Sequence, residues 1–77
     1  MSKLILKDAK TIEKLLFLLG FIKQRQKGSH TFYKHEDGRC TVIPFHSNKV
    51  ISRPLMRKIL NEINLDVEEY NNLIEKI

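Results

Sequence analysis

Two glycine-containing turns, Gly28-Ser29 and Asp37-Gly38, constrain the fold of this 77-residue chain more than any other feature. Asp-Gly is typical of a tight β-hairpin turn, and Gly-Ser provides a similarly short connection. Three short stretches suited to strands flank these turns, and the third is dense in β-branched residues. They cover residues 21–27, 30–34 or 30–35, and 39–45. The sequence therefore predicts a three-stranded antiparallel meander, in which Pro44 marks an edge strand or a strand end.

A helix is predicted on each side of this meander. Asp8 can cap the first helix and Gly20 can end it, whereas Ser52 can cap the second, which tolerates Pro54 in its first turn. Both segments carry apolar residues at helical spacing, which predicts that each faces a core. The stripes are Ile12, Leu15, Leu16 and Leu19, widened by Phe17 and Leu18, and then Leu55, Met56, Ile59, Leu60 and Ile63.

The two ends of the chain add to this pattern. Asp66 with Glu69 resembles a capping box and predicts a short added helix over residues 66–77, whereas residues 1–7 form either a short strand or a docked arm. A bare three-stranded sheet is unstable, so both long helices should cover one face and leave the other open to solvent. We expect one α+β domain over residues 1–77, in the order α-β-β-β-α with an extra C-terminal helix.

Charge is distributed unevenly along the chain, whose net charge is +5. Residues 1–60 hold thirteen lysine and arginine residues against four acidic ones, whereas residues 61–77 hold one lysine against five acidic residues. The basic part suits phosphates, although a ribosomal or membrane-surface protein can show the same balance. The single cysteine, Cys40, fits a reducing cytoplasm and a small core or interface position. The apolar run 4–6 is too short for a signal peptide or a membrane span.

The Gly28-Ser29 turn places His30 at the start of the second strand, in a strongly basic segment. No acidic residue lies between Gly20 and His35, and four cations surround the turn: Lys23, Arg25, Lys27 and Lys34. An imidazole in such a field suits a polyanion and can transfer protons at neutral pH. A polar, solvated histidine without a role is equally compatible with this segment alone.

Five segments follow one another in a characteristic order, and each alone would be a weak signal. They are Leu15-Leu16 with Gly20-Phe21, Arg25 to His30, Tyr33 to Arg39, Thr41 to His46, and Leu55 to Leu60. The order α-β-β-β-α is that of a double-stranded-RNA-binding domain. Together the segments, over roughly residues 10–65, closely resemble the HicA toxin family, small mRNA-cleaving toxins of toxin–antitoxin pairs.

The resemblance implies a metal-independent endoribonuclease of mRNA that needs no cofactor and is neutralised by a HicB-type antitoxin. It implies that His30 is the catalytic residue and that Gly28 and Ser29 form the corner before it. The arm before Asp8 and the acidic segment after Leu65 depart from the usual short pattern.

The chemistry of RNA cleavage assigns further candidates. His30 can act as general base or acid, and Gly28 lets the backbone approach a phosphate. Arg25, Lys27 and Lys34 could neutralise the charged transition state. Arg53, Arg57 and Lys58, around the start of the second long helix, either contact phosphates or form a solvated face.

The remaining histidines and aromatics are less informative. His35 and His46 match no zinc pattern and are expected to be ordinary surface or hairpin residues, so no metal site is predicted, although His46 could lie near the substrate. The second proton-transfer group is unassigned. Of Phe32 and Tyr33, one should face the core and the other should be free to stack on bases. The alternative functions are a non-catalytic RNA-binding module and, without any supporting motif, a basic scaffold or DNA-associated protein.

Overall fold

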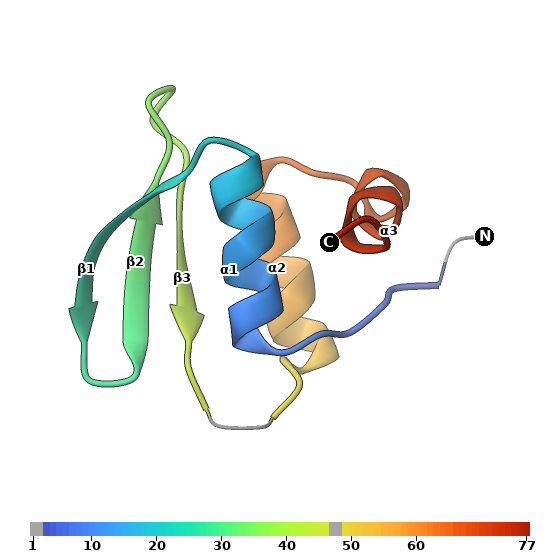
Figure 1. Ribbon diagram of the computed structural model, residues 1–77, viewed down its shortest axis with the longest axis horizontal. Helices are drawn as coiled ribbons and strands as arrows, with labels where there is room; N and C mark the ends of the chain where they lie inside the picture. The colour runs from blue at the N-terminus through green and yellow to red at the C-terminus, as the bar shows by residue number, and fades with distance from the viewer. Residues whose placement is uncertain (1–2, 47–48) are drawn as a thin grey trace.

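The computed structural model describes residues 3–46 and 49–77, and it confirms the expected α+β class and element order. The three strands form one antiparallel sheet in the order β1-β2-β3, so Pro44 lies at the end of an edge strand, as predicted (Figure 1). The elements are α1 (Ala9–Leu18), β1 (Ile22–Lys27), β2 (His30–Lys34), β3 (Cys40–Pro44), α2 (Arg53–Ile63) and α3 (Val67–Ile74).

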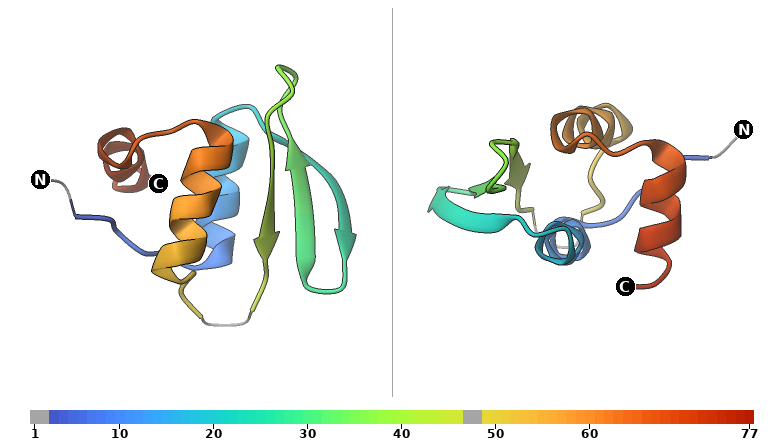
Figure 2. Two further views of the ribbon diagram at one scale, coloured as in Figure 1. Left: turned by 180° about the vertical axis from the view of Figure 1, so that it is seen from behind. Right: turned by 90° about the horizontal axis from the view of Figure 1, so that it is seen from above.

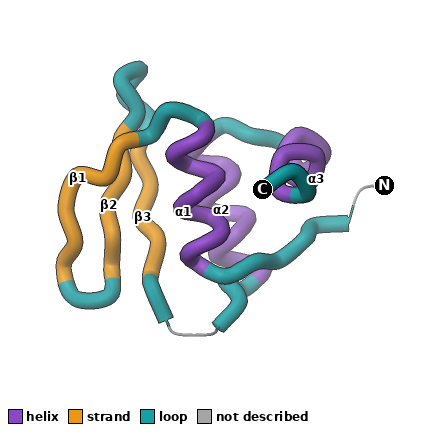
Figure 3. The backbone as a smooth tube through the Cα atoms, in the orientation of Figure 1, coloured by secondary structure: helices purple, strands orange, loops and turns teal. Residues whose placement is uncertain are grey.

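The described elements form three layers. The sheet is the first layer, α1 and α2 lie side by side as the second, and α3 with the N-terminal segment forms the third (Figures 1 and 2). The view from above in Figure 2 shows α1 and α2 end-on and α3 lengthwise, so α3 crosses the helix pair steeply. The tube in Figure 3 shows that the loops lie mainly at the two ends of the sheet. This arrangement places the acidic α3 on the far side of the helices from the sheet.

The two faces of β2 have opposite environments. Thr31 and Tyr33 are buried on the inner face, where they pair with Ile43 and Thr41 of β3. The hydroxyl of Tyr33 donates to the Glu13 carboxylate of α1, and burial raises the pKa of this phenol above its ordinary value. The inner face therefore packs on the helices, as expected, and Tyr33 is its core aromatic.

An irregularity in β1 changes which of its cations share a face. Lys23 pairs with Tyr33 but Arg25 pairs with Phe32, so the register shifts by one residue between them. Strict alternation along residues 21–27 would put Lys23 and Arg25 on the same face of the sheet, but the bulge between them breaks this alternation. All six residues of β1 are exposed. The helices therefore cover β2 and β3, while β1 extends beyond them.

The caps at the helix starts follow the sequence in part, and the stripe of α1 is narrower than predicted. Ser52 occupies the N-cap position of α2, but its side chain makes no capping hydrogen bond. Asp8 accepts hydrogen bonds from the hydroxyl of Thr11 and, at 3.1 Å, from its backbone N–H. The hydroxyl contact first and the backbone contact second lower the pKa of Asp8. Ile12, Leu15 and Leu16 are buried, whereas Phe17 and Leu18 are 48% and 62% exposed. Phe17 still contacts the ring edge of Tyr33, at 6.1 Å between centroids.

The segment before α1 is an extended arm held by α3, not a member of the sheet. The hydroxyl of Tyr70 donates to the Ile5 carbonyl at 2.7 Å, and the Asn71 amide donates to the Lys3 carbonyl at 2.6 Å. Leu4 is buried in the same contact region. The predicted capping of α3 is confirmed, since Asp66 accepts from the Glu69 N–H at 2.7 Å. The helix ends at Ile74, shorter than the predicted 66–77.

Candidate active site

His30 lies on the outer face of the sheet, immediately after the two-residue Gly28-Ser29 turn. Gly28 has φ +60°, in the left-handed region that glycine adopts without penalty. The amide of Gln26 donates to the Gly28 carbonyl at 3.1 Å, and the Phe45 N–H donates to the Ser29 carbonyl at 2.7 Å. These bonds hold the corner between two strands, and His30 follows it with an exposed side chain.

Strand register places one cation beside His30. Lys27 pairs with His30 on one side, and Pro44 pairs with it on the other. Because directly paired residues point to the same face, the three side chains form one row across the outer face. Lys27 is therefore the β1 cation that lies nearest to His30 in the ladder.

The next row on the outer face contains an aromatic platform. Arg25 and Val42 pair with Phe32 from the two sides, and the Arg25 guanidinium lies 4.8 Å from the centre of the Phe32 ring. Such a cation–π stack presents a flat, positively charged surface. Phe32 is therefore the aromatic residue of the outer face, and the sequence had left open whether it or Tyr33 would be.

Lys34 is not close to His30. It pairs with Ile22 and Cys40 at the opposite end of β2. Four residues along a strand separate it from His30, a distance of roughly 13 Å. Cys40 is exposed in this row, so it is not a core residue, and an interface position stays a prediction. The outer face therefore carries two separate basic positions, one beside His30 and one at the other end of the strand.

A groove of about 380 Å³ opens between the edge strand β3 and α2, and His30 forms part of its wall. Three further groups meet there: the imidazole of His46, which the sequence allowed near the substrate, and an ammonium and a carboxylate that it did not place beside His30. The residues lining the groove are His30, Val42, Pro44, His46, Leu55, Lys58 and Glu62.

The helix side of this groove comes from one face of α2. Leu55, Lys58 and Glu62 follow helical spacing and so project from the same side. The Glu62 carboxylate accepts a hydrogen bond from the Thr41 hydroxyl at 2.7 Å, which ties α2 to β3. Of the three cations predicted in this region, Lys58 alone lines the groove with His30. Arg53 is exposed at the first residue of α2.

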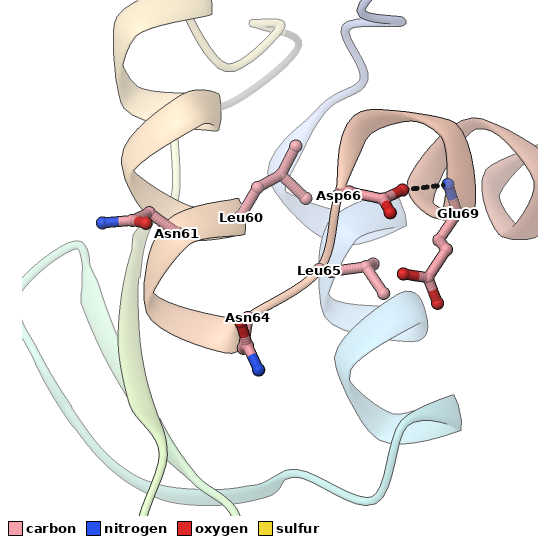
Figure 4. A pocket seen from close by; sticks show the side chains of 6 residues that line it. All are labelled: Leu60, Asn61, Asn64, Leu65, Asp66 and Glu69. Carbon is pink, nitrogen blue, oxygen red and sulfur yellow. Dashed lines mark hydrogen bonds between the residues drawn. The ribbon is translucent and has the colours of Figure 1, made fainter.

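Arg57 faces a different part of the molecule. It lines a hollow between α2 and the start of α3, together with Leu60 and Asp66. A neighbouring groove of about 380 Å³ on the same side is shown in Figure 4. Its lining residues are Leu60, Asn61, Asn64, Leu65, Asp66 and Glu69. The Asp66 carboxylate is occupied in capping α3.

The third histidine, His35, is a structural residue of the hairpin. Its ring packs against Phe21 at 5.2 Å between centroids, and its Nδ1 accepts from the Asp37 N–H at 3.1 Å. The backbone N–H of Arg39 lowers the pKa of Asp37 in the same turn. Within residues 3–46 and 49–77, no cluster of three histidine, cysteine or acidic side chains is arranged to hold a metal ion.

Comparison with known protein families shows to which family this chain belongs. The family described as the HicA toxin of bacterial toxin–antitoxin matches residues 9–65, most of the chain. The chain belongs to the HicA toxin family. It is accordingly a toxin of a toxin–antitoxin system and has an antitoxin as partner. No curated protein matches the sequence. The family match covers α1 through α2 and stops before α3. Separately, none of the helices that the structure describes is long and apolar enough to cross a membrane.

Proposed function

We propose that this HicA-family toxin is a metal-independent endoribonuclease that cleaves mRNA in the cytoplasm, with His30 as a catalytic residue. The observation that carries the proposal is the position of His30. Its side chain is exposed, paired with Lys27 in the ladder, and open to a groove that also holds the Lys58 ammonium. The family match supplies the toxin role to which this chemistry is assigned.

RNA needs little more than proton transfer and charge stabilisation to break its own backbone. The 2′-hydroxyl attacks the adjacent phosphorus once its proton is removed, and negative charge then grows on the phosphate oxygens. His30 removes or supplies the proton, and the ammonium groups of Lys27 and Lys58 neutralise the charge. No step of this scheme calls for a metal ion.

RNA binding is proposed to extend across the outer face from this site. Gly28 and Ser29 let the backbone approach a phosphate, because Gly28 has no side chain and its Cβ position is open space. The Arg25–Phe32 stack offers a flat surface for a base. Lys34 and Arg53 provide exposed cations further along.

A non-catalytic RNA-binding module is the second candidate function. The Arg25–Phe32 platform favours it, because base stacking gives affinity without any chemistry. Cleavage requires proton transfer by His30, whereas RNA binding alone does not.

Cleavage by the purified chain provides the test. His30→Ala should lower the cleavage rate of single-stranded RNA by on the order of 10²–10⁴-fold, while RNA affinity and the thermal unfolding curve remain close to wild type. His30→Gln is the matched variant, since it keeps a polar side chain without proton transfer at neutral pH. Induced expression of wild type should arrest growth, and His30→Ala should relieve the arrest.

Two results would contradict the endonuclease. Wild-type cleavage by purified His30→Ala would remove His30 from the mechanism. RNA binding by the wild-type chain with no cleavage at all would favour the non-catalytic module.

The antitoxin is proposed to be of the HicB type and to cover the outer face of the sheet with an acidic surface. Lys27 and Lys34 lie at opposite ends of that face, so a partner that contacts both spans the length of β2 and occludes His30. The acidic α3 lies on the side of the helix pair that is turned away from the sheet (Figure 1), so it stays outside this contact. Complementary charge would make association fast.

A further inference from the structure

His46 is a titratable group that the proposed function leaves without a role. It lies two residues beyond the end of β3, is exposed, and lines the His30 groove. It also lines an adjoining hollow of about 280 Å³ that continues past Lys49 toward Ser52 at the start of α2. The groove and the hollow share Pro44, His46 and Leu55. His46 therefore lies at the boundary between the groove and the hollow.

Cleavage through the 2′-hydroxyl needs two proton transfers at different oxygens. A base takes the proton of the attacking 2′-hydroxyl, and an acid gives a proton to the departing 5′-oxygen. The two oxygens lie roughly in line on opposite sides of the phosphorus, so one imidazole cannot serve both in the same step. The site needs a second group on the other side of the phosphate from His30.

The remaining polar residues of the groove fit this requirement less well than His46. The Glu62 carboxylate accepts a hydrogen bond from the Thr41 hydroxyl at 2.7 Å, so it is engaged in tying α2 to β3. Lys58 presents an ammonium group that suits charge stabilisation of the phosphate. His46 is an imidazole, the type of side chain that both holds and releases a proton near neutral pH.

We propose that His46 is the general acid of the cleavage reaction and His30 the general base, an inference that rests on the proposed endonuclease function. His30 takes the proton from the 2′-hydroxyl as the 2′-oxygen bonds to phosphorus. The bond from phosphorus to the 5′-oxygen breaks, and that oxygen takes the proton of the His46 imidazolium. The products carry a 2′,3′-cyclic phosphate and a 5′-hydroxyl.

The positions of the two histidines support this assignment of roles. His30 lines the groove and not the adjoining hollow, whereas His46 borders both. The nucleotide whose 2′-hydroxyl attacks is placed in the His30 groove. The RNA fragment that carries the new 5′-hydroxyl then leaves past His46 toward the hollow at Lys49.

The test uses His46→Ala in the full chain, with two RNA substrates. On ordinary RNA, the variant should cleave on the order of 10²–10⁴-fold more slowly than wild type. A second RNA carries sulfur in place of the 5′-oxygen at the cleaved bond, and a thiolate leaves without being protonated. On this substrate His46→Ala should recover to near the wild-type rate, whereas His30→Ala should remain slow.

Controls separate a catalytic role from a structural one. His46→Ala should keep the wild-type unfolding temperature, because the side chain is exposed. Asn61→Ala changes an exposed residue that lines the groove toward α3 and should cleave both substrates at the wild-type rate.

Three results would overturn the assignment of His46. In the first, His46→Ala cleaves ordinary RNA at the wild-type rate. In the second, His46→Ala is slow on both RNAs, so the sulfur substitution does not restore its rate. In the third, the sulfur substitution restores the rate of His30→Ala and not that of His46→Ala. Failure of the proposed function looks different, because His30→Ala would then cleave normally or the wild-type chain would not cleave at all.

Discussion

Two grooves of about the same volume, 380 Å³ each, flank α2 and differ in their chemistry. The groove toward β3 holds His30, His46 and Lys58. The groove toward α3 holds Asn61, Asn64 and carboxylates, of which Asp66 is occupied as a helix cap (Figure 4). A hollow of a given size therefore indicates a function only when its walls carry groups that are free to react.

The largest expected effect is on the α3 side and concerns stability. Tyr70 is fully buried and its hydroxyl bonds the Ile5 carbonyl. Tyr70→Ala should lower the free energy of unfolding by about 3–5 kcal/mol, because a large core side chain is lost. Denaturant titration measures this change, and RNA cleavage below the unfolding transition should remain at the wild-type rate. A cleavage defect in the folded variant would show that the α3 side also contributes to the reaction, which contradicts the difference proposed between the two grooves.

Tyr70→Phe is the milder version of this variant and adds a pH signature. Burial raises the pKa of Tyr70 to about 12 from 10.0, so the folded state favours the neutral phenol. The resulting stability is present below pH 10 and is lost as the pH rises toward 12. The stability difference between wild type and Tyr70→Phe should therefore shrink across this range in denaturant titrations at several pH values. A constant difference would show that the hydroxyl is not held as described.

The next effect distinguishes two neighbouring cations of α2. Lys58 lines the His30 groove and Arg57 faces α3. Lys58→Ala should slow RNA cleavage by on the order of 10²-fold, because charge at the reacting phosphate is lost. Arg57→Ala is the matched control and should stay within about twofold of wild type. Equal defects in single-turnover cleavage would mean that α2 contacts RNA on both sides.

A smaller effect is expected on antitoxin association. Reversing Lys27 and Lys34 to glutamate should slow association at low salt by about tenfold or more, and should make the rate less dependent on salt. Reversing Glu68 and Glu69 to lysine, in the exposed first turn of α3, is the control on the other side of the molecule. Surface plasmon resonance at several salt concentrations measures both. If reversing Glu68 and Glu69 changed the association rate more than reversing Lys27 and Lys34, the antitoxin would bind on the α3 side, which would contradict the proposal.

The smallest expected effect is that of chelation. EDTA should leave the cleavage rate unchanged, because the proposed mechanism uses only imidazole and ammonium groups. Loss of activity in EDTA that a specific divalent metal restores would contradict that mechanism.

Local sequence features predicted the element order well because each element has its own start and stop. The Asp8 and Asp66 caps and the turns at Gly28 and Gly38 act over three or four residues, and all are present. The bulge between Lys23 and Arg25 was not predictable in this way. All of β1 is exposed, so no hydrophobic face fixes its register.

The candidate site was predictable only in part for a related reason. His30 was indicated by its turn and its neighbours in sequence. The association of His30 with Lys58 and Glu62 depends on how α2 packs against an edge strand, which no local pattern specifies. The sequence allowed His46 near the substrate, and the pairing of Pro44 with His30 explains why, because His46 follows Pro44 by two residues.

The exposed edge strand β1 has a consequence for solubility. A bare strand edge is a template on which a second copy of a sheet can add, and lysines along the edge oppose such pairing. Lys23, Arg25 and Lys27 are spread along β1, so two copies brought edge to edge would repel each other. The charges proposed to attract RNA thus also protect the free toxin from aggregation. Replacing them to weaken RNA binding would carry a risk of precipitation at high protein concentration.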